Sequence, residues 1–452
     1  MRLSPLWACA CSLLAFEACA ASGTGPTSEI SRIREEMQRM RAEYEQRMNA
    51  LEERLRRAEQ AAAEARQRAT RAEEASVAPT AAAPAAAEAP NRFNPSIGLI
   101  LNGRLAAFSR PAEENGIPGF SIGEEATKGP DGFSLGESEL SVEAAIDDRF
   151  YGRFTLAVES GDHGDEVGVE EGFVQTTALG HGLTLLGGRY YPGIGYLNDR
   201  HTHTDAFADR PLPYRAFLDT QYNDDGAGLR WVAPTDLLVE VGADYLRGAH
   251  YPAGGAADSG KGAYAVYAHA GGDVGVSHSW RAGVGYLHAE ARDRADSEDD
   301  LFSGATDLWI ADAVWKWAPN GNPYRHNLTL QGEFLWQRAD GAFTPRGKHG
   351  VPYRADAWGL YGQAVYQFLP GWRLGGRIAW LHAADPGPAL VGSVLDAGGR
   401  DPRQYSVMID WSHSEFSRLR LQYNRDESRR RPDDQILLQY TMSLGAHGAH
   451  TF

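Results

Sequence analysis

The chain has 452 residues, a formal net charge of −16 and 42% hydrophobic residues. An acidic chain of this kind is poorly suited to nucleic acid, whose phosphates attract basic surfaces, so we expect no nucleic-acid partner. No stretch is long and apolar enough to predict a transmembrane helix, but a membrane-spanning β-barrel stays compatible with this composition because its apolar residues are hidden in alternation.

Residues 1–20 predict an export signal. Arg2 gives a positive start, an apolar run follows from Leu6 to Phe16, and residues 18–20 (Ala-Cys-Ala) offer a small-x-small cleavage site. All three cysteines lie inside this segment, so the mature chain would carry no thiol and no disulfide framework. Anchoring of a lipoprotein through Cys19 is the alternative interpretation of the same segment.

Residues 28–75 predict an α-helical coiled coil. They contain no proline or glycine, and apolar residues recur in steps of three and four with one extra step of four, at Ile30, Ile33, Met37, Met40, Tyr44, Met48, Leu51, Leu55, Ala58, Ala62, Ala65 and Ala69. Such a seam is a heptad repeat with one stutter, which has to be buried against a partner helix. A semi-stiff linker rich in alanine and proline follows at residues 76–93.

Residues 94–452 predict an all-β fold, a transmembrane antiparallel β-barrel of about sixteen strands. In Trp358–Phe368 and Trp372–Leu381, apolar and polar residues alternate over lengths that suit a tilted membrane-spanning strand. The predicted strands are 96–109, 133–147, 149–160, 167–179, 182–192, 226–234, 237–248, 262–271, 277–291, 305–318, 324–338, 354–368, 371–384, 403–413, 416–427 and 434–446.

The predicted connections alternate between short turns and long loops, the asymmetry of an outer-membrane barrel. The long loops are expected at 110–132, 193–225, 249–261, 292–304, 339–353 and 385–402. An even number of strands places both ends of the barrel on the short-turn, periplasmic side, which agrees with a periplasmic coiled coil. The chain ends in Phe452, a terminal aromatic residue of the kind that the outer-membrane assembly machinery reads.

Taken together, the signal, heptad segment, linker, strands and Phe452 resemble Gram-negative trimeric porins with an N-terminal periplasmic coiled coil. The stretches GIGYLNDRHTHTDAFADRPLPYRAFL (193–218) and QYNDDGAGLRWVAPTDLLVEVGAD (221–244) resemble a family often labelled zinc-regulated, TonB-dependent outer-membrane receptors. The resemblance implies an outer-membrane location, contact with lipid and a homotrimer. A TonB-dependent transporter has about twenty-two strands around a folded plug, so the strand count favours a porin.

In porins generally the third long loop folds into the lumen, so the resemblance implies that 193–225 forms the pore constriction. The constriction residues predicted on this basis are Asp199, Arg200, His201, His203, Asp205, Asp209, Arg210 and Arg215. His201, His203 and Asp205 are spaced by two, which places them on one side of an extended chain, and two imidazoles with a carboxylate suit Zn²⁺. Pore lining without a bound metal is the alternative.

Alternation also predicts lumen-facing charges of both signs, which would set a transverse field across the channel. The acidic set is Glu137, Glu139, Glu143 and Glu159, and the basic set is Arg373, Arg377, Arg418 and Arg420. The predicted function is passive diffusion of small hydrophilic solutes or ions, with divalent metal ions such as zinc among the candidates.

Three other interpretations stay open. The barrel could be a structural tether whose coiled coil contacts the cell wall, or it could be a metal-uptake receptor. A hydrolase built from His201, Asp205 and a serine is the third, but no serine lies on a sharp, glycine-flanked turn, so we predict no enzymatic activity and no cofactor.

Overall fold

The computed structural model describes residues 95–445, apart from 112–113, 115, 162–163 and 256–261. The predicted signal peptide (1–20), coiled coil (28–75), linker (76–93) and assembly residue Phe452 lie outside the described residues. They stay predictions.

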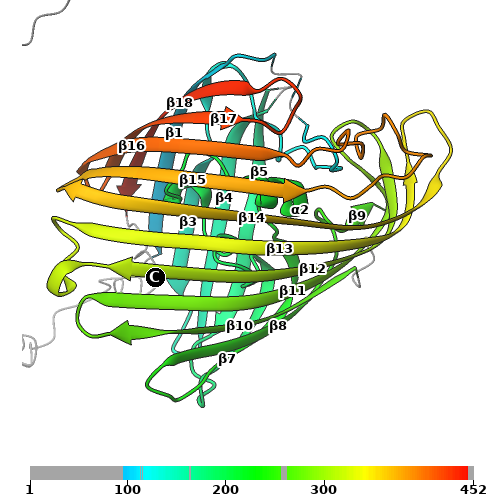
Figure 1. Ribbon diagram of the computed structural model, residues 1–452. Helices are drawn as coiled ribbons and strands as arrows, with labels where there is room; N and C mark the ends of the chain where they lie inside the picture. Colours follow the sequence, from blue (N-terminus) through cyan, green and yellow to red (C-terminus); the bar gives the residue numbers. More distant parts are fainter. Residues whose placement is uncertain (1–94, 112–113, 115, 162–163, 256–261, 446–452) are drawn as a thin grey trace, which may run out of the picture. The chain divides into compact units, whose positions relative to one another are not determined.

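Nearly all of the regular structure is β-strand (Figure 1). The strands are β1 (Ser96–Phe108), β2 (Gly132–Leu135), β3 (Ser138–Ala145), β4 (Phe150–Gly161), β5 (Gly164–Thr176), β6 (Leu183–Tyr190), β7 (Asp224–Val232), β8 (Leu238–Leu246), β9 (Gly254–Gly255), β10 (Ala263–Val274), β11 (His278–Ala295), β12 (Leu301–Trp317), β13 (Asn327–Thr344), β14 (Val351–Leu369), β15 (Trp372–His382), β16 (Arg403–Ser414), β17 (Ser417–Asp426) and β18 (Asp433–Gly445).

These strands close into one antiparallel ring. Each barrel strand pairs with the next along the chain, and β1 pairs with β18, from Gly98 opposite Gly445 to Phe108 opposite Gln435. β2 and β3 both pair with β1 and act as one interrupted strand, while the two-residue β9 pairs with β11 in parallel. Sixteen strands therefore form the ring in the described part of the chain, which confirms the predicted fold class. Closure leaves no open sheet edge.

The predicted strands all occur, but the hairpins of β11–β12 and β13–β14 are longer than predicted. β11, β12, β13 and β14 have 18, 17, 18 and 19 residues, so the β11–β12 and β13–β14 connections shrink to residues 296–300 and 345–350. Cross-strand ion pairs lie where the β13–β14 extension begins, Arg338–Asp356 at 2.9 Å and Arg354–Asp340 at 3.6 Å, with the partners exposed. Phe302 and Phe343 of the extensions are buried against Leu390 and Leu395, but charged residues and glycines between them interrupt the apolar alternation, so the pattern could not predict these ends.

The outer face of the barrel is apolar and is bordered by aromatic rings. On β11–β15, neighbouring strands carry Tyr286, Trp309, Trp336, Trp358 and Trp380, and Trp309 and Trp336 stack at 4.5 Å between centroids. A second border contains Trp372 and Trp411 at 5.9 Å. Trp372 and Trp380 are eight residues apart on β15, about 26 Å along a strand, which matches the lipid-facing band of a tilted transmembrane barrel.

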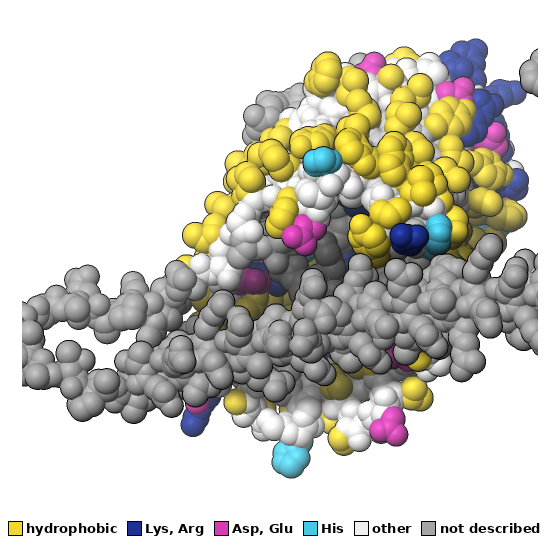
Figure 2. Space-filling view, turned by 90° about the vertical axis from the view of Figure 1, so that its left-hand side faces the viewer, with side chains coloured by type: hydrophobic (Ala, Val, Ile, Leu, Met, Phe, Trp, Pro, Cys, Tyr) yellow, Lys and Arg dark blue, Asp and Glu magenta, His cyan; other side chains and the backbone are white. Residues whose placement is uncertain are grey.

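Figure 2 faces the end with the short turns: hydrophobic side chains cover the outside of the wall, and acidic and basic side chains are visible in the hollow within it. Among the described residues, no helix has the length and apolar character needed to cross a membrane.

The largest buried core lies inside the ring, where the connection between β6 and β7 packs against the wall. We call this connection, residues 191–223, the lumen loop. Its residues Ile194, Leu212 and Phe217 join a buried cluster with Ile310 and Leu381 of the wall. The loop contains η1 (Thr202–Thr204) and α2 (Leu212–Leu218), and α2 contacts β13, β14 and β15 from within the ring (Figure 1).

Candidate functional site at the lumen loop

The lumen loop is attached to the barrel wall at three places, and the first is Glu333 of β13. The carboxylate of Glu333, which is buried, accepts hydrogen bonds from the backbone amides of Tyr196 (2.9 Å) and Leu197 (3.2 Å). It also accepts the hydroxyl protons of Tyr214 (2.8 Å) and Tyr361 (2.5 Å). Four donors on one buried carboxylate hold the start of the loop and the first turn of α2 against the same wall.

The second attachment is the arginine wall, which we define as Arg373, Arg377, Arg418 and Arg420 of β15 and β17. Three of its guanidinium groups donate hydrogen bonds of 2.6 Å to carbonyls of the loop: Arg418 to His203, Arg420 to Asp205, and Arg377 to Asp209. Arg377 also contacts the Asp209 carboxylate at 2.6 Å. The fourth arginine, Arg373, pairs with Asp410 of β16 at 2.6 Å.

Asp209 is the loop carboxylate that the arginine wall holds. Besides Arg377, it accepts hydrogen bonds from Gln422 at 2.5 Å and Asn424 at 3.0 Å. Burial alone would raise the pKa of Asp209, but Arg377 and these donors lower it below its ordinary value. Asp205 pairs with Arg210 at 2.8 Å, yet its deeper burial raises the pKa of Asp205.

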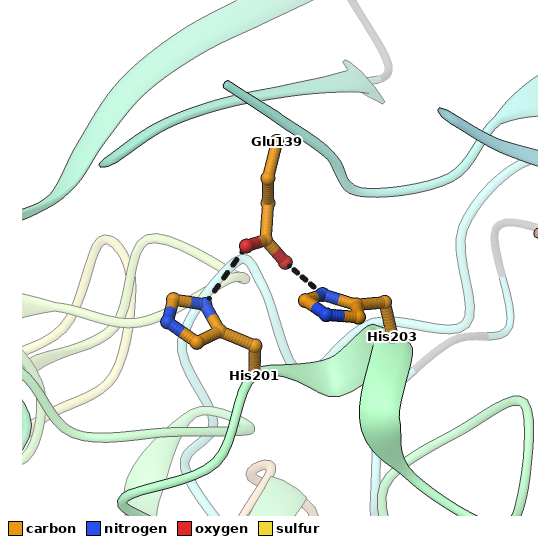
Figure 3. Close-up of side chains that lie close together, drawn as sticks. All are labelled: Glu139, His201 and His203. Carbon is orange, nitrogen blue, oxygen red and sulfur yellow. Dashed lines mark hydrogen bonds and ion pairs between the residues drawn. The ribbon is translucent and has the colours of Figure 1, made fainter. Parts of the chain in front are cut away.

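The third attachment is an acidic cluster, which we define as Glu137, Glu139, Glu170 and Glu171. Glu139 lies between two imidazoles (Figure 3): its Oε2 is 3.0 Å from Nδ1 of His201, and its Oε1 is 2.5 Å from Nδ1 of His203. His201 also contacts Glu170 (Nδ1 to Oε2, 3.2 Å) and Glu171 (Nε2 to Oε2, 3.0 Å). Between the two histidines, Thr202 donates its hydroxyl proton to Glu137 at 2.7 Å.

Two irregularities of strand register bring these four glutamates together. In the β4–β5 pair, Thr155 faces Glu171 and Leu156 faces Val169, so Glu170 is an extra residue, a β-bulge. Along β1, Gly103 faces Leu135 and Ile100 faces Glu139, so two residues of β1 (101–102) oppose three (136–138). Bulges re-aim side chains, and they let neighbouring glutamates contact the same side of the loop.

The electrostatics of the cluster are dominated by its carboxylates. Burial alone would lower the pKa of His201, but Glu139, Glu170 and Glu171 raise it well above its ordinary value. Arg153 of β4 contacts Glu171 at 3.6 Å and Glu143 at 2.9 Å.

The structure brings together most of the predicted constriction residues, but it groups them differently from the predicted metal set. His201 and His203 meet at Glu139, while the carboxylate of Asp205 faces Arg210 instead. The predicted metal set is therefore corrected in its carboxylate: Glu139, not Asp205, lies beside His201 and His203. The reason is that the 3-10 turn at 202–204 breaks the extended conformation on which the spacing by two depended.

The remaining predicted loop residues have mostly structural partners. Arg210 is buried and donates to the carbonyl of Leu197 at 2.6 Å, and the buried Arg215 donates to that of Ala126 at 2.8 Å. Arg200 lies over the ring of Tyr196 at 4.2 Å. Asp199 keeps 37% of its side chain exposed and lies 4.0 Å from Arg281.

Both predicted walls of lumen-facing charge are present, but their main contacts are with the loop between them rather than with open water. The acidic wall contributes Glu137 and Glu139 to the cluster, and Glu143 pairs with Arg153. The side chain of Glu159 lies outside the described part of the structure. Buried charges need partners, and the loop's histidines, Asp209 and backbone carbonyls supply them to both walls.

Sequence reasoning missed Glu170, Glu171 and Glu333. Strict alternation allows only one of two adjacent glutamates to face the lumen, so it could not assign both residues of the pair 170–171. Glu333 shares the polar face of its strand with Gln331, and alternation would have found it. Its partner Tyr214 is 119 residues away in the chain, which no local pattern reveals.

No family model matches the chain. An uncharacterized protein of Aquifex aeolicus (strain VF5) is 28% identical in an alignment 391 residues long, which covers 80% of this chain and 80% of that protein. Solved structures similar to the chain include OmpT, an outer membrane protein of Vibrio cholerae (10% identity, 77% of this chain and 97% of that chain, TM-score 0.48). Others are the outer membrane channel DcaP of Acinetobacter baumannii (11%, 78% and 97%, 0.47) and an anion-selective porin from Comamonas acidovorans (10%, 78% and 99%, 0.46).

A likeness of this degree does not extend to substrate or mechanism. The resemblance to the zinc-regulated receptors gains no support from these comparisons and stays a prediction.

Proposed function

We propose that the protein is an outer-membrane porin through which small hydrophilic solutes or ions diffuse passively. The observation that carries the proposal is a closed ring of sixteen strands with an apolar outer face and a charged inner face. Inner side chains keep part of their surface open to solvent: 37% for Asp199, 32% for Arg153 and 28% for Arg373. A ring of this strand number is wide enough to leave an aqueous passage beside the packed lumen loop.

We also infer that the lumen loop is the constriction of this channel. Its attachments to Glu333, to the arginine wall and to the acidic cluster lie on different strands of the ring, so the loop crosses the interior. Pro211 and Pro213, at the start of α2, restrict the backbone there and help the loop keep its shape. Exposed acidic residues on other connections, among them Glu124, Glu298 and Asp299, favour cations at the mouth.

The test is a planar-bilayer recording of the purified, refolded protein. We expect stepwise ion conductance and, under a KCl gradient, a reversal potential that indicates weak cation preference. Folded protein that inserts without conductance steps would overturn the porin proposal. A strong anion preference would overturn the selectivity alone.

The same recording separates the porin from the tether. A variant lacking residues 28–75 should conduct like the full chain and, if the heptad segment holds a homotrimer together, should dissociate more readily in detergent. A barrel that never conducts, together with a cell-envelope defect caused by this deletion, would favour the tether.

A further inference from the structure

We propose that Glu139, His201 and His203 form a binding site for a divalent transition-metal ion of the zinc class, with Glu170 as a further donor. The site lies where the lumen loop meets β3 and β5 (Figure 3). It goes beyond the proposed porin function, and binding does not require that the barrel conduct.

The donor atoms are close enough to share one ion. One ligand atom from each of Glu139, His201 and His203 lies within 4.8 Å of the others, and so does one oxygen from each of Glu137, Glu139 and Glu170. Nδ1 of His201 is close to carboxylate oxygens of both Glu139 (3.0 Å) and Glu170 (3.2 Å), so the two groups adjoin. Zinc binds imidazole nitrogen and carboxylate oxygen at about 2.0–2.2 Å in tetrahedral sites, which requires donors a few ångströms apart.

The charge balance of the cluster favours a cation. Four glutamates converge here, and Glu139 keeps only 3% of its surface exposed. Within the described residues, the ion pairs of the acidic cluster are with the two histidines and Arg153. Buried carboxylates in contact repel one another unless they take up protons or a cation lies between them. A divalent ion between Glu139 and the imidazoles would displace the protons from the nitrogens that it binds and place two positive charges where these carboxylates meet.

The surroundings hold the ligands in place. Nε2 of His201 is 3.0 Å from Glu171, the carboxylate–histidine arrangement that orients a metal-binding imidazole from its far side. The ring of Tyr191 meets His201 edge-on at 5.7 Å. The backbone of His203 is held by Arg418 at 2.6 Å, so both histidines are positioned before any ion arrives.

The ligand types select among cations. Calcium and magnesium prefer oxygen-only shells, whereas imidazole suits zinc, copper, nickel and cobalt. We therefore expect Zn²⁺ or Co²⁺ to bind in the presence of excess Mg²⁺ and Ca²⁺.

The first test is calorimetric titration of untagged, full-length protein in detergent with ZnCl₂ at neutral pH. We expect one zinc ion per chain, and at least tenfold weaker binding in His203→Ala and in Glu139→Ala. The matched control is His382→Ala, because His382 also contacts an aspartate, Asp401, at 2.8 Å but lies outside the cluster. Wild-type protein with no saturable binding, or His203→Ala that binds as tightly as wild type, would overturn the proposal.

The second test uses wild-type protein alone and does not depend on variants that fold. Zinc K-edge X-ray absorption of the one-to-one complex should show two imidazole ligands with oxygen donors. A coordination shell made of oxygen donors only would contradict the proposed site. Conductance is recorded without metal, so a barrel that binds zinc but does not conduct contradicts only the porin proposal. A barrel that conducts but does not bind zinc contradicts only the metal site.

Discussion

The arginine wall and the acidic cluster hold the same loop by different means. In the arginine wall, β15 pairs in regular register with β16 and β17 with β18, and irregularities lie only beside Arg373 (β14–β15) and Arg418 (β16–β17). Its long side chains donate mainly to backbone carbonyls of the loop. The acidic cluster depends on a bulged strand and on an interrupted one, and it contacts the loop through side chains. Because the arginine wall binds backbone carbonyls, its contacts do not depend on which side chains the loop carries at those positions. The contacts of the acidic cluster require the imidazoles of His201 and His203.

The two regions also differ in what balances their charge. Guanidinium groups of the arginine wall stay cationic at any physiological pH, so a buried carboxylate beside them is paired. In the acidic cluster, four carboxyl groups outnumber the side chains of His201, His203 and Arg153 that contact them, so a metal ion can take the place of protons there. The arginine wall is thus a permanent attachment, and the acidic cluster is the attachment that can exchange its cation.

The largest effect should come from removing one arginine of the permanent attachment. Arg377→Met keeps an unbranched apolar stem but removes the guanidinium group and leaves Asp209 buried without its cation, which costs on the order of 3–5 kcal/mol. The measurement is the free energy of unfolding in urea, followed by tryptophan fluorescence in detergent micelles.

The matched control for this substitution is Arg338→Met. Arg338 pairs with Asp356 at 2.9 Å, but both side chains are 40% or more exposed, so we expect a loss of about 0–1 kcal/mol. If the two substitutions cost the same, the arginine wall is not an anchor of the loop.

Asp219 and Asp209 both lie in the lumen loop, and their pKa values are shifted in opposite directions, so they predict opposite dependences of stability on pH. Asp219, which ends α2, accepts the amide of Ala126 at 2.6 Å, and burial raises the pKa of Asp219 to about 6. The pKa of Asp209, beside Arg377, is lowered instead. A raised pKa stabilises the fold below the unfolded value, near 4, and this stabilisation is lost as pH rises through 6. A lowered pKa has the opposite sign: its stabilisation is present above about pH 4 and is lost in acid.

We therefore expect the change in the free energy of unfolding caused by Asp219→Asn to be more stabilising at pH 7.5 than at pH 4. The difference should be about 2 kcal/mol, since each pKa unit is worth about 1.4 kcal/mol. Asp209→Asn should destabilise it at pH 7.5 and have less effect in acid. Urea unfolding of both variants at the two pH values is the measurement. Equal pH profiles would contradict the claim that the arginine decides the ionisation of a buried loop carboxylate.

The fold could be predicted from the sequence because one physical requirement repeats along it. Along the central part of each strand, every second side chain is apolar, as in Trp372–His382, and the alternation predicts these segments with their order and number. The predicted strand ends are wrong at the tips of β12, β13 and β14. There the hydrogen-bonded ladder continues although residues such as Asp340 and Gly341 interrupt the apolar alternation, and Phe343 is buried against Leu390 and Leu395.

The site could be predicted only in part, for a related reason. His201 and His203 were recognised by residue type and by their place in a long loop. Their carboxylate partner was assigned within the loop, to Asp205, although it comes from the wall. The bulge at Glu170 reverses the alternation that lumen-facing predictions use, and a bulge of one residue leaves no mark in the sequence.

The smallest effect is expected from a substitution at Glu143, which lies beside the acidic cluster and tests how far the proposed metal site extends along β3. Glu143 of β3 pairs with Arg153 at 2.9 Å, but it makes no contact with the lumen loop among the described hydrogen bonds and ion pairs, and both side chains are about a quarter to a third exposed. Glu143→Gln keeps a hydrogen-bonding group of the same shape, so solvent and Arg153 absorb the change at a cost of less than about 1 kcal/mol. Zinc affinity, measured by the same calorimetric titration, should stay within twofold of wild type. A larger loss of affinity would mean that the cation-binding region extends along β3 toward the short-turn end of the barrel, and that the carboxylates act as one field rather than as a ligand set centred on Glu139.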